Sequence, residues 1–123
     1  MEKIFDSKCV TYMLVLHRDE MKRIRALAKY NVSKWVRAAV EAAFRVPLTE
    51  PLPQTFVLAS DRVRLGWSMP KDMIEAVDRD RDRPDIAGCS RALWFRAAVL
   101  RYLAECEAAE AAREAAEAVG AAE

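Results

Sequence analysis

Trp35-Val36-Arg37-Ala38-Ala39-Val40 recurs 59 residues later as Trp94-Phe95-Arg96-Ala97-Ala98-Val99, and five of the six residues are identical. In a chain of 123 residues this recurrence indicates an internal duplication. The segments upstream also correspond, because each begins with an apolar alternating stretch, continues as a charged helical pattern, and carries a serine followed by a basic residue shortly before the tryptophan. The sequence therefore predicts a strand–helix–helix unit that occurs twice.

The first unit is expected over residues 9–44. Residues 9–16 are rich in β-branched and aromatic side chains, which is typical of a strand. From His17 the apolar residues follow a 3.6-residue period, which predicts a helix. Residues 31–33 interrupt this pattern, and we expect the Ser33 hydroxyl to cap a second helix over about 34–44.

The second unit is expected over residues 62–103, after a connector over 45–61 that contains three prolines. Within the connector, residues 56–58 are predicted either to add a short strand or to pack on the core. The unit itself reads as a strand over 62–69, Pro70 at the first helical position, a helix to about Arg79, a charged loop over 80–88, and a final helix capped by Ser90.

Strand alternation predicts which side chains face the core. One unit of this size cannot bury its own apolar face, so we expect the two strands to pair antiparallel with each other. The inward face is then formed by Val10, Tyr12, Leu14 and Leu16 with Val63, Leu65, Trp67 and Met69. The outward face is formed by Cys9, Thr11, Met13 and Val15 with Arg62, Arg64, Gly66 and Ser68.

Composition and charge narrow the class of protein. Length predicts one domain over 1–123, and the absence of a signal-peptide pattern or a long apolar run predicts a cytoplasmic protein outside the membrane. Three cysteines and one histidine do not suit a disulfide framework or a zinc site, so we expect no metal and no cofactor. Residues 104–123 hold six Glu and one Arg, a net charge of −5, which leaves +6 for residues 1–103. The body is therefore modestly basic, and its Ala/Glu-rich tail is acidic, able to extend the last helix, and expected to fray.

The pattern resembles the ribbon-helix-helix proteins of the Arc/MetJ superfamily. Residues 88–99 are similar to that family's second-helix signature, and residues 69–72 are similar to its junction between strand and helix. The first copy departs from the family at His17, which stands where the second copy has a proline. The resemblance implies an α+β, mostly α fold in which two ribbon-helix-helix repeats form an intramolecular pseudo-dimer, with one two-stranded antiparallel ribbon and four core helices. It also implies a major-groove DNA binder, similar to two-repeat accessory proteins of conjugative relaxosomes and to plasmid or viral repressors.

Candidate DNA contacts follow from this reading. The base-reading candidates on the outward face are Arg62, Arg64, Ser68, Thr11 and Met13, among which an arginine can make two hydrogen bonds to guanine. The phosphate-binding candidates at the starts of the second helices are Ser33, Lys34, Ser90 and Arg91. Trp35 and Trp94 are interpreted as core residues rather than base-stacking platforms. His17 and the alternating residues 78–83 are interpreted as solvated surface, with a DNA-contacting loop as the second reading of 78–83.

Two functions are predicted as alternatives. The first is a sequence-specific double-stranded DNA-binding protein, monomeric in solution and able to associate on DNA, that acts as a transcriptional repressor or as an accessory factor in plasmid DNA transfer. The second is a protein-interaction module, antitoxin-like or involved in assembly, that keeps the fold without reading bases. The apolar side chains Met13 and Val15 on the outward face favour the second. No nucleophile–base pair can be assembled, so we expect no enzymatic activity.

Overall fold

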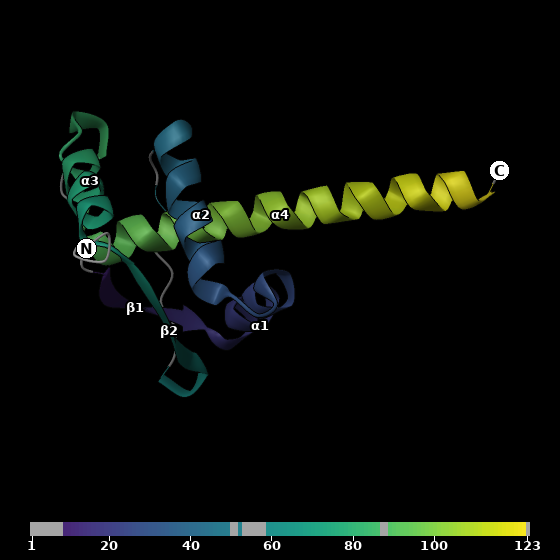
Figure 1. Cartoon of the computed structure of the whole chain (residues 1–123), viewed down its shortest axis with the longest axis horizontal. Coiled ribbons are helices and arrows are strands. Elements are labelled where there is room, and N and C mark those ends of the chain that lie inside the picture. The colour runs from purple at the N-terminus through teal and green to yellow at the C-terminus, as the bar shows by residue number, and fades with distance from the viewer. Residues whose placement is uncertain (1–8, 50–51, 53–58, 87–88, 123) are drawn as a thin grey trace, which may run out of the picture.

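The computed structural model describes residues 9–49, 52, 59–86 and 89–122. Within these ranges the protein is an α+β structure, mostly helical, with one two-stranded antiparallel sheet and four α-helices. The elements are, in order, β1 (Cys9–His17), α1 (Arg18–Ala28), α2 (Val32–Arg45), the 3-10 helix η2 (Ala59–Asp61), β2 (Arg62–Pro70), α3 (Lys71–Arg81), the 3-10 helix η3 (Pro84–Ile86) and α4 (Arg91–Ala122). Figure 1 shows the two strands on one side of the molecule and α4 running past them. Residues 56–58 of the connector, which were predicted to add a short strand or to pack on the core, lie outside the described residues.

The sheet has the pairing predicted from the sequence. β1 runs antiparallel to β2, with Val10 opposite Met69 and Leu16 opposite Val63. The predicted inward face is confirmed: Leu14, Leu16, Leu65, Trp67 and Met69 are buried and Tyr12 and Val63 are half-buried. Val10 shares this face by its position but is exposed, because it lies near the end of the strand.

The first helix begins at a capping box that the sequence reading missed. The Nδ1 atom of His17 accepts a hydrogen bond from the N–H of Asp19 at 3.1 Å, and the His17 N–H donates to Glu20 Oε1 at 2.9 Å. These two bonds satisfy orphan donors of the first turn. His17 therefore starts α1 through its side chain, although it is an unusual residue at this position.

The second helix begins earlier than predicted, and Ser33 does not cap it. Asn31 is the N-cap, since its Oδ1 accepts from the N–H of Lys34 at 3.0 Å. Ser33 lies inside the first turn, and its hydroxyl accepts from the N–H of Ser68 in β2 at 3.3 Å. At the other end, Arg101 of α4 donates to the carbonyl oxygens of Ala42, Val46 and Pro47. The arginine thus satisfies carbonyl groups that a helix end leaves open.

The second unit also differs from its prediction in detail. Pro70 is the N-cap residue of α3 rather than its first helical residue. α3 continues to Arg81, so residues 80 and 81, which were predicted in the loop, are helical. Ser90 caps α4 as predicted, because its Oγ accepts from the N–H of Leu93 at 3.1 Å.

Helices α2 and α4 pack against each other and against the inner face of the sheet. The buried residues of both helices include alanines, and the tryptophan of each hexapeptide packs on an aromatic ring of the other helix, with ring centroids 5.1 Å apart for Trp35 and Tyr102 and 5.6 Å apart for Trp94 and Phe44. Trp35 and Trp94 are both buried, which confirms that they are core residues. The core thus lies between the ribbon and the helices, and the other face of the ribbon is exposed.

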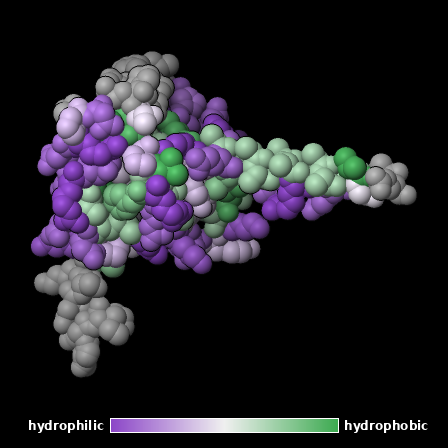
Figure 2. All heavy atoms as spheres, turned by 90° about the horizontal axis from the view of Figure 1, so that it is seen from above, coloured by the Kyte–Doolittle hydropathy of each residue, from purple (hydrophilic) through white to green (hydrophobic). Residues whose placement is uncertain are grey.

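The last part of α4 projects from the body of the protein (Figure 1). Arg23 of α1 holds its base through hydrogen bonds of 2.8 and 2.6 Å to the carboxylate of Glu107. Residues 111–120 are exposed throughout, and the helix continues to Ala122, as the composition of the tail predicted. Figure 2 shows this projection as mostly pale green alanine with purple, hydrophilic side chains along one edge. None of the helices in the described ranges combines the length and apolarity needed to cross a membrane.

Candidate nucleic-acid interface

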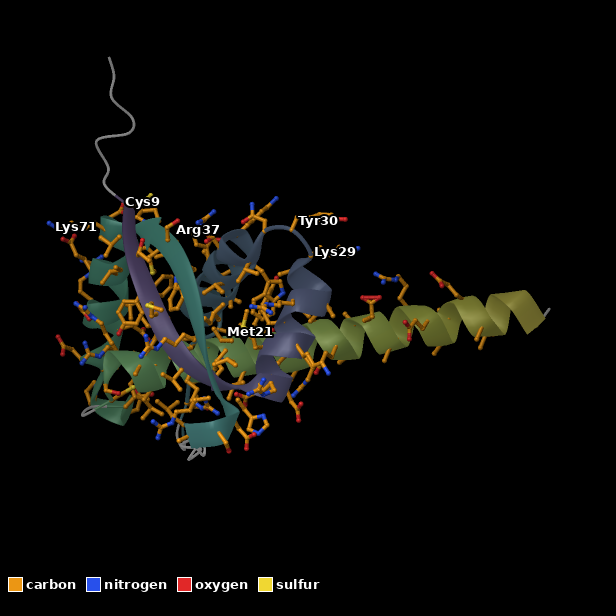
Figure 3. All side chains as sticks on the ribbon, turned by 90° about the horizontal axis from the view of Figure 1, so that it is seen from below. Cys9, Met21, Lys29, Tyr30, Arg37 and Lys71 are labelled. Carbon is orange, nitrogen blue, oxygen red and sulfur yellow. The ribbon has the colours of Figure 1, made fainter. Side chains whose placement is uncertain are left out.

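The outer face of the ribbon is not covered by any described element. Figure 3 views the molecule from this side and shows β1 and β2 in front of the helices. The predicted outward side chains are exposed, except that Ser68 is half-buried and Gly66 has no side chain. Strand alternation therefore presents one row of residues from each strand to the outside.

Register sorts the outer face into three zones along the ribbon. Thr11 is opposite Ser68, which puts two hydroxyl groups at one end. Met13 is opposite Gly66 in the middle. At the other end Val15 is opposite Arg64 and His17 is opposite Arg62, so this end carries two arginines, with the carboxylates of Asp19 and Asp61 3.9 and 3.7 Å from the His17 ring. The outer face therefore changes along the ribbon, from hydroxyl groups at one end through an apolar middle to two arginines at the other end.

The middle of the outer face is open because of Gly66. A Cβ atom built at this position meets Met13 Cγ and the carbonyl oxygen of Tyr12 at 4.0 Å, which is ordinary van der Waals distance. A side chain can therefore be added here without disturbing the fold. Met13 and Val15 beside it are 53% and 44% exposed.

Arg64 differs from Arg62, the other cation among the base-reading candidates, in its contacts with the described residues. It is exposed, and within the described ranges its guanidinium has no ion pair or hydrogen bond. Arg62 is also exposed, but it takes part in an interaction with another residue. Arg64 is consequently the cation that a ligand on this face can use without displacing a protein contact.

The ribbon is held from behind by an aromatic cluster. The ring centroids of Tyr12 and Trp67, which face each other across the strands, are 5.3 Å apart, and both rings contact Phe95 of α4 at 4.8 and 5.2 Å. Tilted and edge-on aromatic pairs of this kind add to the stability that burial provides. The outer face therefore rests on a rigid support.

The arginines of the two hexapeptides hold the strands in the same way. Nη1 of Arg37 donates to the carbonyl oxygen of Ser68 at 2.7 Å, and Nη1 of Arg96 donates to the carbonyl oxygen of Val15 at 3.2 Å. Ser68 and Val15 are 53 residues apart, as are the starts of the two strands, Cys9 and Arg62. Each helix thus contacts the strand of the other unit at the corresponding position.

The two helix starts that were predicted to bind phosphate differ in their charges. At the start of α2, Lys34 is exposed and forms no ion pair in the described part of the chain. The Ser33 hydroxyl beside it is already bonded to β2. First-turn N–H groups of a helix lack intrahelical partners and favour anions, and the cation of Lys34 adds positive charge at this same end of α2.

At the start of α4 the cation is already paired. Nε and Nη2 of Arg91 donate to the two carboxylate oxygens of Asp78 at 2.9 and 2.6 Å. The hydrogen bond from Arg91, together with one from Arg81, lowers the pKa of Asp78 to about 2, and the same pair raises the pKa of Arg91. Arg91 must leave Asp78 before it can bind a phosphate.

Residues 78–83 form a structural network that the sequence reading did not predict. Asp78 binds Arg81 as well as Arg91, and Asp80 lies 3.2 Å from Nε of Arg83. Asp80 also accepts a hydrogen bond of 2.8 Å from the indole N–H of Trp94. These two Asp–Arg pairs could have been predicted from their spacing of three residues, because side chains three residues apart lie next to each other on a helix. These charges fix the end of α3 to α4.

The described residues contain neither a group of metal-ligating side chains nor a disulfide. No three His, Cys, Asp or Glu side chains there are grouped to hold a metal ion. Cys9, Cys89 and Cys106 form no disulfide within the described residues, and Cys89 is buried. Comparison of the chain with protein-family models, with curated proteins and with solved structures finds no match.

Proposed function

We propose that this protein is a sequence-specific double-stranded DNA-binding protein that inserts the outer face of its ribbon into the major groove. The observation that carries the proposal is a two-stranded antiparallel ribbon whose outer face is covered by no described element and carries two exposed arginines at one end. The major groove is about 12 Å wide and admits such a ribbon, whose strands are about 4.8 Å apart. The cation of Arg64 and the hydroxyl groups of Thr11 and Ser68 are groups that can bond to base edges.

The proposal includes a single-chain pseudo-dimer of two ribbon-helix-helix repeats. The matched contacts of Arg37 and Arg96 support it, as do the equal lengths of α1 and α3, which are 11 residues each. Light scattering should then give a folded particle of 13.9 kDa, the mass of one chain. A compulsory dimer, with strands paired between chains, would contradict this part of the proposal.

Different residues have different roles in this complex. Arg64 contacts a guanine, with Arg62 beside it, while Thr11 and Ser68 bond to bases at the other end and Met13 touches a thymine methyl group. Phosphates on the two flanks bind at the start of α2, near Ser33 and Lys34, and at the start of α4, near Ser90 and Arg91. Because Arg91 must first release Asp78, the α2 side provides the stronger phosphate contact.

The cellular role proposed is that of a cytoplasmic transcriptional repressor or of an accessory factor in plasmid DNA transfer. Both roles need a protein that marks one DNA site, and the resemblance of residues 88–99 to the ribbon-helix-helix signature supports them. Other DNA-processing or regulatory proteins would then assemble beside it. Fold does not by itself determine function, so DNA binding has to be tested on the ribbon.

The second candidate is a protein-interaction module, antitoxin-like or involved in assembly. The exposure of Met13 and Val15 favours it, because apolar side chains grouped on an open face are typical of a surface that a protein covers. The two candidates use the same face of the ribbon. They differ in whether a negatively charged partner is required.

Selection of bound duplexes from a random pool at near-physiological salt tests the first candidate. The decisive variant is Gly66→Glu, which puts a carboxylate in the middle of the outer face at a position with room for a side chain. Gly66→Gln is the matched control, because it adds the same volume without the charge. We expect the pool to converge on one sequence and Gly66→Glu to bind it at least tenfold more weakly than Gly66→Gln, since the carboxylate repels phosphates. Failure of the pool to converge, or equal binding by the two variants, would favour the protein-interaction module.

A further inference from the structure

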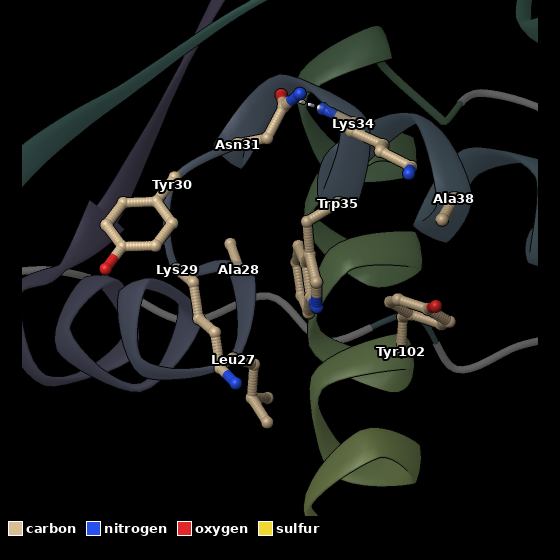
Figure 4. Close-up of a pocket in the computed structure, with 9 residues that line it drawn as sticks. All are labelled: Leu27, Ala28, Lys29, Tyr30, Asn31, Lys34, Trp35, Ala38 and Tyr102. Atoms are coloured by element: carbon tan, nitrogen blue, oxygen red, sulfur yellow. Dashed lines mark hydrogen bonds between the residues drawn. The ribbon is translucent and has the colours of Figure 1, made fainter.

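A hollow of about 380 Å³ lies between the end of α1, the start of α2 and the side of α4. Its apolar lining includes Leu27, Trp35, Ala38 and Tyr102, and Lys29 and Lys34 stand at its edge. Figure 4 shows the indole of Trp35 between the Leu27–Lys29 segment and the ring of Tyr102. This α1–α2 hollow is thus an apolar site with two cations, and its volume falls in the range of small-ligand pockets.

Trp35 brings an unpaired donor to the hollow. Its side chain is only 9% exposed, and its indole nitrogen is buried without a hydrogen-bond partner within the described residues. A buried donor left unpaired destabilises the folded state, so native structures almost always provide an acceptor. Trp35 is therefore a group that an added acceptor would satisfy.

The second unit shows which acceptor fits. The corresponding tryptophan, Trp94, donates to the carboxylate of Asp80 at 2.8 Å, and that carboxylate is also paired with Arg83. Asp80 is the tenth residue of α3, and the tenth residue of α1 is Leu27. At the same place in the first unit, an apolar side chain lines a hollow where the second unit has a carboxylate. Lys29 and Lys34, which have no ion pair in the described ranges, supply the positive charge there.

The backbone at the hollow is strained. Lys29, which ends α1, has φ of +57°, and it is the one residue other than glycine with positive φ in the described ranges. A side chain with a β-carbon adopts this conformation at an energetic cost, and such strain gathers at ligand sites. The strained backbone and the unpaired indole both indicate a ligand site at this hollow.

We infer that the α1–α2 hollow binds the carboxylate of a small apolar or aromatic acid. The carboxylate takes the place that Asp80 has in the second unit, accepts the hydrogen bond from Trp35, and is balanced by Lys29 and Lys34. The apolar part of the acid packs on Leu27, Ala38 and Tyr102. Because the indole nitrogen is buried, a lining side chain moves aside as the acid enters. This binding does not depend on the proposed function, since the ribbon takes no part in it.

Titration of the full chain with 3-phenylpropionate, followed by NMR, tests the inference. The protein has three tryptophans, and the Trp35→Phe variant identifies the indole N–H signal of Trp35 by its loss. We expect the acid to shift this signal in a saturable way while the signal of Trp94 stays in place. The matched neutral probe, 3-phenylpropanamide, has the same ring and chain without the charge, and we expect it to bind at least tenfold more weakly. An unmoved Trp35 signal, or equal binding of acid and amide, would overturn the inference.

A variant gives a second, independent test. Leu27→Asp puts a carboxylate of the chain itself where α3 has Asp80, and it should raise the melting temperature and abolish binding of the acid. Leu27→Ala is the control, because it widens the hollow without filling it and should keep binding. A folded Leu27→Asp protein that binds 3-phenylpropionate as well as the parent would contradict the inference. Neither test contains DNA, so their failure leaves the proposed function untouched.

Discussion

Arg96 of α4, which is buried, and Glu20 of α1, which is half-buried, form an ion pair with Nη2 of the arginine 3.2 Å from Oε2 of the glutamate. Arg96 is 7% exposed, and its other terminal nitrogen bonds to the carbonyl oxygen of Val15. Glu20 also accepts from the N–H of His17, at the junction between β1 and α1. This ion pair thus joins a strand, the helix that follows it and a helix from the other end of the chain.

Glu20→Ala should strongly destabilise the fold. Removing one partner of a buried ion pair leaves a charge without compensation, which typically costs about 3–5 kcal/mol. The free energy of unfolding in urea measures this loss. Glu105→Ala is the control, because Glu105 is exposed and lies 3.8 Å from Arg101, so its loss should change stability by less than ~0.5 kcal/mol. Similar losses in the two variants would show that the pair of Arg96 and Glu20 contributes little.

Trp94→Phe should destabilise more than Trp35→Phe. Both substitutions remove a similar part of a buried ring, but only Trp94 loses a hydrogen bond, its 2.8 Å contact with Asp80. A typical hydrogen bond contributes about 1 kcal/mol, and bonds to charged groups contribute more. Trp94→Ala should cost about 3–5 kcal/mol, enough to unfold or nearly unfold a small domain. Thermal unfolding compares the three variants, and a less stable Trp35→Phe than Trp94→Phe would be the opposite of this expectation.

Asp78 should make stability depend on acidity. Its pKa is lowered to about 2 in the folded protein, chiefly by the hydrogen bond from Arg91, whereas an unfolded Asp has a pKa near 3.9. The contribution of the pair is therefore present above pH ~4 and is lost as the pH falls toward 2. Because both side chains are partly exposed, screening by water should limit it to about 1 kcal/mol. We expect Asp78→Asn to be less stable than the parent at pH 7 and this difference to shrink as the pH falls through 2, and a difference independent of pH would contradict this.

Arg64→Ala and Lys34→Ala should weaken DNA binding in different ways. A lost arginine–guanine contact should cost ~1–3 kcal/mol at one base pair of the selected site, and its effect should vanish on duplexes changed at that pair. A lost phosphate contact should weaken all duplexes alike and reduce the salt dependence. Because the outward residues of the two strands differ, the site should not be a palindrome. Unchanged affinity and preference in Arg64→Ala would remove the groove-reading assignment.

The projecting part of α4 should be dispensable for folding and should oppose DNA binding. Ending the chain after Ala108 keeps the Arg23–Glu107 pair and removes four Glu and one Arg, a net charge of −3. We expect an unchanged melting temperature and tighter binding to random duplex at low salt, because the removed charges repel phosphates. The difference should fade near 0.15 M salt, where the Debye length is about 8 Å. Equal binding at low salt would leave the projection without this role.

The elements of the fold could be predicted because they follow from regular patterns. Alternation of side chains correctly identified the inward residues of both strands, such as Tyr12 in β1 and Met69 in β2. The repeated hexapeptide located the packed faces of α2 and α4. The caps were harder. Asn31 and Ser33 both suit an N-cap, and only the position of β2 decides that the Ser33 hydroxyl bonds to the strand instead.

The sequence predicted which residues belong to the candidate site, but it did not predict which other residues they bond to. Arg91 reads as a phosphate ligand from its place beside Ser90, yet it bonds to Asp78, which lies 13 residues earlier on another helix. The hollow beside Trp35 was not predictable at all. It depends on Leu27 occupying the position that Asp80 has in the second unit. The sequence shows this difference, but only the structure shows that the indole of Trp94 has an acceptor and that the indole of Trp35 has none within the described residues.

The pairing of β1 with β2 inside one chain has a consequence at low copy number. A ribbon made from two separate chains falls apart on dilution, and its folded fraction depends on how many copies a cell holds. Here residues 18–61, which include α1 and α2, tie the two strands together, so the strands pair within one molecule at an effective concentration that dilution does not change. The ribbon therefore stays assembled even when only a few molecules are present, and each strand can change in sequence without requiring the same change in the other.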